Sequence, residues 1–182
     1  MVTAAVSARP QEAGGFKTEY LNELSGTSEH LLQLAEAMPA DKYGWRPGTG
    51  VRSTGEVYIH IALGNFLLLG MTGVKPPAEY YPDVKMKADG PDVEAINQRD
   101  VVLAKTVQGK EQVQRLLKMS LDAVREHFST LSAADLDKPA DFFGKKTTVR
   151  GIYLRILAHV NEHYGQSIAY ARMNGIVPPW SK

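Results

Sequence analysis

His159 and His163 lie one helical turn apart near the C-terminal end of the chain, and His60 lies far upstream. Side chains at positions i and i+4 project from the same face of a helix, so both imidazoles could reach one cation. A third ligand must come from another element, and His60 lies in an amphipathic pattern of its own. These residues predict a three-histidine site for one divalent metal ion. Zinc and nickel both suit it, because imidazole alone does not discriminate between them.

Neighbours of these histidines are candidates for orienting them. Glu56, one turn before His60, could accept its free ring N–H, and Gln166 could orient His163 or hold a bound water. Each has a simpler alternative: Glu56 could only cap its helix, and Gln166 could only satisfy a buried polar contact. Glu162 flanks the two C-terminal ligands. It is the candidate general base, if the geometry brings its carboxylate to the site.

Two other kinds of metal site fit the sequence poorly. Residues 159–163 read H-V-N-E-H, the order found in inverted zincin proteases. No Asp or Glu follows His163, however, so the downstream carboxylate ligand of those proteases is missing. A dinuclear carboxylate site would need E-x-x-H on two helices, and this motif does not occur. One metal ion held by three nitrogens fits better.

Composition excludes further chemistry. The chain has no cysteine, so thiolate ligands, disulfides and a cysteine nucleophile are all ruled out. With 21 basic and 20 acidic residues the net charge is +1, which gives no general field for attracting nucleic acid or an anionic membrane. The remaining histidines, His30 and His127, lie beside the apolar stripes of their helices. We expect them to be structural or surface residues.

Four amphipathic helices must position the site. Apolar residues recur at steps of three and four, and they predict helices at about 17–38, 53–71, 110–131 and 148–174. Ser53 and Glu56 form a capping box at the start of the second helix. Gly175 supplies a stop signal at the end of the fourth.

The connections between these helices differ in length. The segment 72–109 contains four prolines and no sustained period, so we expect a long crossover there, whereas 137–146 reads as an ordinary loop. This arrangement predicts an all-α fold, a four-helix bundle with a long crossover connection between the second and third helices. The crossover would let those two helices run parallel.

A chain of 182 residues with 43% hydrophobic content suits one compact domain. We expect that domain at 16–182, preceded by a flexible N-terminal arm at 1–15 that is rich in Ala and Gly. Asn65 and several glycines interrupt the most apolar stretch, so no membrane helix is predicted. We therefore expect a soluble protein, cytoplasmic by default, with neither nucleic acid nor membrane as partner.

Three stretches of the chain carry a family resemblance: YGWRPGTGVRSTGEVYIHIA at 43–62, HVNEHYGQ at 159–166 and YARMNGIVPP at 170–179. They resemble the DinB/YfiT-like superfamily, and the likeness spans nearly everything from 16 to 179. The resemblance implies a four-helix bundle, commonly a homodimer, with one divalent metal ion per chain. The family's histidine pattern falls on His60, His159 and His163.

The resemblance leaves the reaction open. Characterised relatives include metal-dependent transferases of low-molecular-weight thiols and related isomerases, while most members have no assigned activity. Three neutral imidazoles leave the charge of the ion uncompensated and a coordination position free. One class of function is therefore a metal-dependent enzyme, a small-thiol transferase or a hydrolase, with 72–109 shaping its pocket. The other is a non-catalytic, stress-associated, metal-binding dimer; an open position facing a cleft would favour the enzyme.

Overall fold

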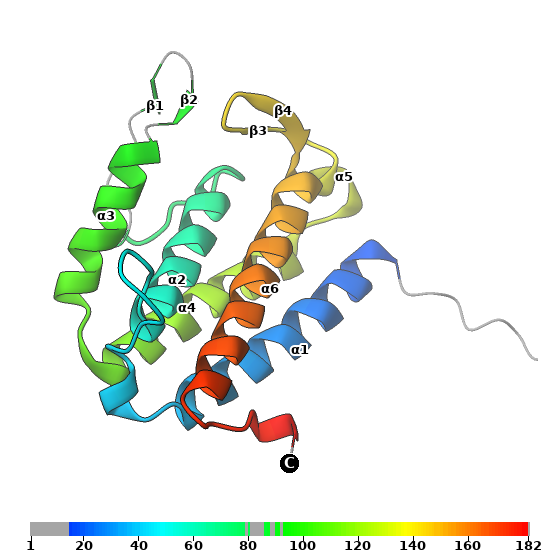
Figure 1. Ribbon diagram of the computed structural model, residues 1–182. Helices are drawn as coiled ribbons and strands as arrows, with labels where there is room; N and C mark the ends of the chain where they lie inside the picture. The colour runs from blue at the N-terminus through cyan, green and yellow to red at the C-terminus, as the bar shows by residue number, and fades with distance from the viewer. Residues whose placement is uncertain (1–14, 79, 81–85, 88–89, 92, 182) are drawn as a thin grey trace, which may run out of the picture.

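The computed structural model describes residues 15–78, 80, 86–87, 90–91 and 93–181. This part of the chain is mostly helical, which confirms the predicted all-α class (Figure 1). The first helix begins directly at Phe16. Residues 1–14 of the predicted flexible arm lie outside the described residues.

The long helices are α1 (Phe16–Ala37), α2 (Thr54–Gly70), α4 (Gly109–Thr130) and α6 (Val149–Met173), close to the four ranges predicted from periodicity. Both α2 and α4 start at the lower end of the bundle and run upward in Figure 1, whereas α1 and α6 run downward. The expected parallel course of the second and third bundle helices is therefore confirmed. A short 3-10 helix, η1 (Ala40–Lys42), follows α1, and another, η2 (Pro179–Ser181), lies near the C-terminus and packs on α1.

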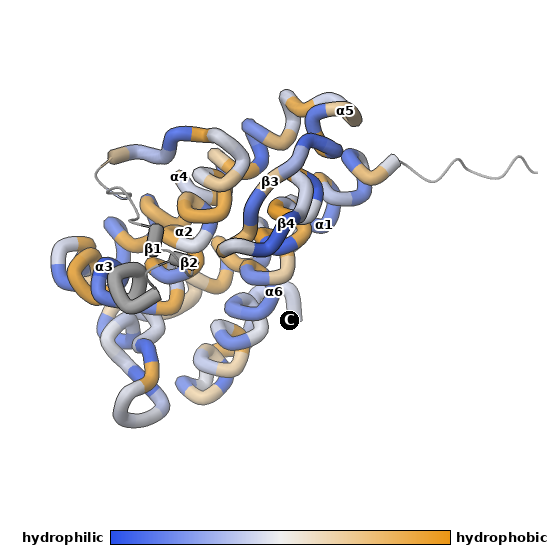
Figure 2. Tube along the Cα trace, turned by 90° about the horizontal axis from the view of Figure 1, so that it is seen from above, coloured by the Kyte–Doolittle hydropathy of each residue, from blue (hydrophilic) through white to orange (hydrophobic). Residues whose placement is uncertain are grey.

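Helix α2 lies at the centre of the fold. It packs against α4 and α6 and is covered on a further side by α3, so most of its residues are buried and its trace is largely hydrophobic in Figure 2. The predicted capping box is present: the Ser53 side chain accepts from Glu56 N, and the Glu56 carboxylate accepts from Ser53 N at 2.7 Å. A fully buried Leu63 or Phe66 contributes about 1.5–3 kcal/mol by its burial. Few positions on α2 are therefore left for polar side chains.

The crossover contains a helix that the sequence did not predict. Within 72–109, α3 (Val93–Thr106) packs along α2 and runs opposite to it, and the two-residue strands β1 (Met86–Lys87) and β2 (Gly90–Pro91) pair before it. The prolines that argued against a helix in this segment all lie before α3, so they do not interrupt its hydrogen bonds. Gly109, with φ at +79°, allows the turn from α3 into α4.

The predicted loop at 137–146 is also wrong, because it contains a β-hairpin. After a one-turn helix, α5 (Ala133–Leu136), strand β3 (Pro139–Phe142) pairs with the antiparallel strand β4 (Lys145–Thr148). The two turn residues, Phe143 and Gly144, have φ values of 53° and 81°, as a type I′ turn requires. Thr148 then caps α6, so the hairpin leads directly into the helix that carries His159 and His163.

Among the described residues, no helix combines the length and apolar character needed to cross a bilayer.

Candidate metal centre

The fold brings the three predicted ligands together. His60 extends from α2, and His159 and His163 extend from α6, which packs along α2. One ligand nitrogen from each residue lies within 4.8 Å of the others, and His60 Nε2 is 3.3 Å from His159 Nε2. Two nitrogens bound to one tetrahedral zinc ion at about 2.0–2.1 Å would be roughly 3.3 Å apart. The donor set and its spacing therefore fit a metal ion of this kind.

Asp100 on α3 fixes the proton on His60. His60 Nδ1 donates to Asp100 Oδ2 at 2.7 Å, and the Asp100 side chain is only 10% exposed. Because a carboxylate can only accept this bond, Nδ1 carries the hydrogen and Nε2 presents a bare lone pair toward the other histidines. Arg99, at 3.4 Å, and Arg52, at 3.9 Å, stabilise the charge of that carboxylate.

Of the two roles predicted for Glu56, the structure shows the capping role. Its carboxylate accepts from Ser53 N, as the cap of α2, and pairs with Arg46 at 3.0 Å. The acceptor for His60 is Asp100 instead. Sequence reasoning missed Asp100 because 72–109 was predicted as a crossover with no helical period of its own, and only the helix α3 brings this residue alongside α2.

A chain of hydrogen bonds fixes His163. The Tyr170 hydroxyl donates to the Arg52 carbonyl at 3.2 Å, and Gln166 Nε2 donates to that hydroxyl at 2.9 Å. The amide oxygen of Gln166 then faces His163 Nδ1 at 2.8 Å. Because the backbone carbonyl of Arg52 can only accept, it sets the donor and the acceptor in each of these three hydrogen bonds. His163 Nδ1 must donate to Gln166, which leaves its Nε2 bare, and this contact agrees with the first of the two roles predicted for Gln166.

His159 is the most deeply buried of the three. Its ring lies directly over Gly64 of α2, where an added Cβ would come within 2.3 Å of His159 Cε1. Its Nδ1 is buried without a hydrogen-bond partner among the described residues. If Nε2 is the metal ligand, Nδ1 carries the proton and is a buried donor without a partner. Such a donor costs about 1–3 kcal/mol of stability, which binding of a cation at Nε2 would offset.

Burial favours the neutral imidazole of His159 and His163. It lowers the pKa of His159 to about 3, with smaller contributions from the neighbouring His163 and His60. Burial also lowers the pKa of His163, although the hydrogen bond to Gln166 acts in the opposite direction. A metal requires deprotonated imidazole nitrogens, so this environment suits ligation at neutral pH.

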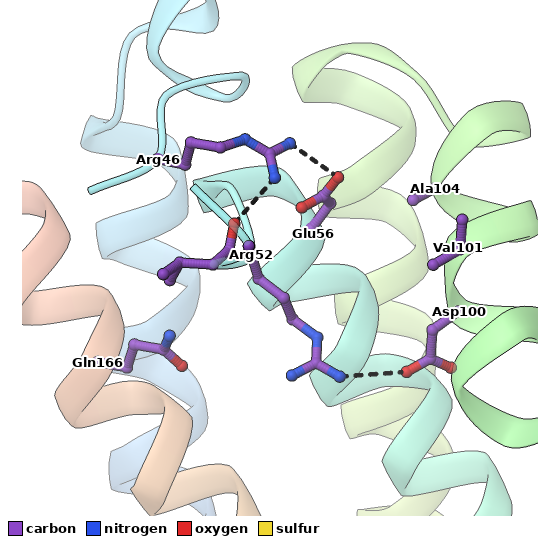
Figure 3. Close-up of a pocket in the computed structure, with 9 residues that line it drawn as sticks. Arg46, Arg52, Glu56, Asp100, Val101, Ala104 and Gln166 are labelled. Carbon is purple, nitrogen blue, oxygen red and sulfur yellow. Dashed lines mark hydrogen bonds and ion pairs between the residues drawn. The ribbon is translucent and has the colours of Figure 1, made fainter. Parts of the chain in front are cut away.

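Two cavities flank the histidines. The larger, about 570 Å³, is polar at one side, where Arg52 points toward Asp100 and Gln166 lies on the facing helix (Figure 3). The smaller, about 250 Å³, is lined by His60 and His159 themselves together with mainly apolar neighbours. The histidine cluster is thus open to a cavity on the side of His60 and His159.

Glu162 is not brought to the cluster. Its side chain is 62% exposed, its carboxylate pairs with Arg155 at 3.4 Å, and it is absent from the group of converging ligand atoms. The geometry gives no support to its use as a general base, which needs hydrogen-bond reach of the reacting group.

The comparisons with known proteins agree with this fold. A DinB-like protein from Bacillus cereus superposes with a TM-score of 0.67 at 18% identity, covering 89% of this chain and 95% of its own. A DinB-like protein from Bacillus subtilis gives 0.62 at 19% identity, covering 87% and 93%. A conserved protein from Enterococcus faecalis gives 0.66 at 16% identity, covering 88% and 97%.

Curated proteins offer no match to this chain. The sequence profile of the DinB superfamily, in contrast, matches residues 23–167, which include all three histidines and most of the bundle. The chain belongs to the DinB superfamily.

Proposed function

We propose that this protein is a metal-dependent enzyme that binds one zinc or nickel ion per chain through His60, His159 and His163. The observation that carries the proposal is the convergence of three imidazoles beside a cavity, with the Nδ1 atoms of His60 and His163 both occupied as donors. Carboxylates and amides that hold metal-ligating imidazoles in this way are a regular feature of metal sites.

The residues of the chain have distinct parts in this proposal. Asp100 holds the proton at His60 Nδ1, and Gln166 holds the proton at His163 Nδ1, so that both rings offer Nε2. Gly64 leaves room for the ring of His159. An ion bound there would act as a Lewis acid and lower the pKa of a water or thiol in its free position.

The reaction class proposed is transfer of a small thiol, or hydrolysis. Such chemistry needs a position open to substrate, and the cavity that His60 and His159 line supports the proposal because it would give a substrate access to a bound ion. This opening favours an enzyme over a non-catalytic, stress-associated metal-binding protein, whose coordination sphere would be closed. A homodimer and a cytoplasmic location, expected from the resemblance and by default, are part of the same proposal.

The test is turnover that depends on the ion. The untagged protein, loaded with zinc or nickel, is assayed for transfer of low-molecular-weight thiols to electrophiles and for hydrolysis of esters and amides. We expect an activity that chelation abolishes, that added metal restores, and that the His60, His159 and His163 triple-alanine variant lacks. Metal uptake without turnover in any assay would favour the non-catalytic alternative, and equal turnover by the variant would contradict the proposal.

A further inference from the structure

The smaller cavity beside the histidines has one strongly apolar side. Leu67 and Leu68 of α2 form one part of it, and Phe142 and Phe143 at the tip of the β3–β4 hairpin form another. The two phenyl rings contact each other with centroids 4.8 Å apart. At about 250 Å³ the cavity is smaller than the roughly 300–1,000 Å³ of pockets for drug-sized ligands, so it suits a compact molecule.

Phe143 occupies a backbone position that its side chain disfavours. Its φ of 53° lies in the left-handed region, where a type I′ turn favours Asn, Asp or Gly at this position. Phe142 could line the cavity from a strand without such strain, but Phe143 adds a second ring at the turn itself. Strained residues of this kind are concentrated at ligand sites, where the side chain has a task that outweighs the strain.

The polar part of the cavity is positively charged. Arg99 and Arg155 line it, and Asp100, the one carboxylate among the lining residues, pairs with Arg99 at 3.4 Å, so Arg155 is the cation that a ligand could engage. Arg155 lies one turn before His159 on α6, so both side chains project from the same face of the helix. Its bond to Glu162 is 3.4 Å long and exposed, and exposed ion pairs of this type are weak. A ligand carboxylate could therefore replace Glu162 at this guanidinium.

From these features we infer that the cavity binds a compact carboxylate with an apolar body: the body contacts the Leu67, Leu68, Phe142 and Phe143 wall, and the carboxylate pairs with Arg155. This inference rests on the proposed function in that it names the substrate class of the same site. In this position the ligand is held next to His60 and His159, while the phenyl rings shield it from water.

Three matched probes test the inference by calorimetry on the 182-residue chain: 4-phenylbutyrate, its neutral amide, and butyrate, which lacks the phenyl group. We expect 4-phenylbutyrate to bind at least about tenfold more tightly than either of the others, because each of them loses one of the two contacts. Equal binding of acid and amide, or of 4-phenylbutyrate and butyrate, would overturn the inference.

Arg155→Gln should weaken binding of 4-phenylbutyrate about tenfold and remove the preference for the acid over the amide, with Arg155→Lys in between. The matched control is Arg125→Gln, which removes another exposed arginine, paired with Asp122 on α4, and should leave both affinities unchanged. A preference for the acid that persists in Arg155→Gln but disappears on chelation would place the carboxylate at the metal ion and overturn the assignment to Arg155.

Phe143→Asn separates a ligand role from a structural one. Asn followed by Gly144 suits a type I′ turn, so the melting temperature should be unchanged or about 2–4 °C higher. Affinity for 4-phenylbutyrate should nevertheless fall about tenfold, while affinity for butyrate changes little. A lower melting temperature with unaltered affinity would show that Phe143 serves only the fold.

The same titrations on zinc-loaded and chelated protein distinguish this inference from the proposed function. Binding of 4-phenylbutyrate by a chain that takes up no metal would support the pocket and reject the metal-dependent enzyme. Metal uptake by a chain that binds none of the probes would reject the pocket alone.

Discussion

Helix α6 contributes to two clusters of side chains in which the histidines have different surroundings. Near its start, Tyr153 packs on Phe128 with ring centroids 4.7 Å apart, and its hydroxyl is hydrogen-bonded to His127 Nδ1. Further along, the rings of His159 and His163 lie 4.6 Å apart and face His60. The first cluster, which also includes Tyr20, is an aromatic core with a single histidine at its margin.

Comparison of the two clusters shows which structural feature distinguishes a candidate metal site from an ordinary core histidine. In the aromatic cluster, His127 Nδ1 has a hydroxyl partner, and stacked and edge-on ring contacts stabilise its surroundings. In the histidine cluster, ring nitrogens from two helices converge, and His159 Nδ1 has no partner among the described residues. Both clusters contain a histidine that is at least half-buried, whereas convergence of bare nitrogens is the feature that suits a cation.

The largest effect should come from the aromatic cluster. Phe128→Ala removes a fully buried ring that contacts Tyr20 and Tyr153, so we expect the free energy of unfolding to fall by about 3–5 kcal/mol. Zinc stoichiometry at a temperature well below the transition should not change. Chemical denaturation and a zinc titration measure the two quantities, and loss of zinc binding in the folded variant would show that the clusters are coupled.

Gly64→Ala should damage the histidine cluster specifically. The new Cβ would lie 2.3 Å from His159 Cε1, so the ring must move, at an expected loss of about 1–3 kcal/mol of stability together with weaker zinc binding. Gly165→Ala on α6 is the matched control, because nothing lies within 4 Å of its Cβ position. We expect that control to be as stable as the wild type or slightly more stable. Equal effects in both variants would mean that the space over Gly64 has no special importance.

Asp100→Asn tests whether the carboxylate of Asp100 orients His60 for metal binding. The amide keeps the shape of the carboxylate but loses its charge, so Nδ1 of His60 is held less firmly as a donor. Zinc affinity should fall about 10–100-fold, measured by competition with a chromophoric chelator, with little change in helical content. Glu56→Gln, which changes the capping residue instead, should leave zinc affinity within about twofold of wild type. A larger effect at Glu56 than at Asp100 would reverse our assignment.

The smallest effect for each step of the measurement, at most about 1.4 kcal/mol per pH unit, concerns pH in the metal-free protein. The pKa of His159 is about 3 in the fold and higher in the unfolded chain, so the unfolded state binds the proton first as the pH falls. Stability from this residue is complete above about pH 6.5 and should be lost at about 1.4 kcal/mol per pH unit between there and pH 3. Denaturation of wild type and His159→Asn across this range measures the difference in slope. Parallel curves would contradict a neutral, buried His159.

Much of this arrangement was predictable from sequence because helical periodicity is a strong signal. It gave the four bundle helices, and it placed His60, His159 and His163 on facing helices. The role of Asp100 was not predictable, because the prolines in 72–109 argued against a helix in that segment, and α3 was therefore not predicted. Helical spacing left two roles open for Glu56, acceptor for His60 or cap of its helix, and its carboxylate caps the helix at Ser53 N.

The hairpin was missed for a different reason. A two-residue turn is recognised in sequence by Asn–Gly or a similar pair, and here the pair is Phe143–Gly144. The departure from the usual turn chemistry occurs beside the histidine cluster, at the cavity that His60 lines. The usual turn signal is thus missing next to the cavity, which agrees with the inference that Phe143 serves a ligand rather than the turn.

The central claim is that the converging histidines, and not buried histidine as such, bind a metal ion. The most direct test is the zinc stoichiometry of the untagged protein beside His159→Ala and the matched His127→Ala variant. We predict about one zinc per chain in the wild type and in His127→Ala, and none in a folded His159→Ala. Zinc retained at full stoichiometry by His159→Ala, or neither zinc nor nickel bound by the wild type, would contradict the account.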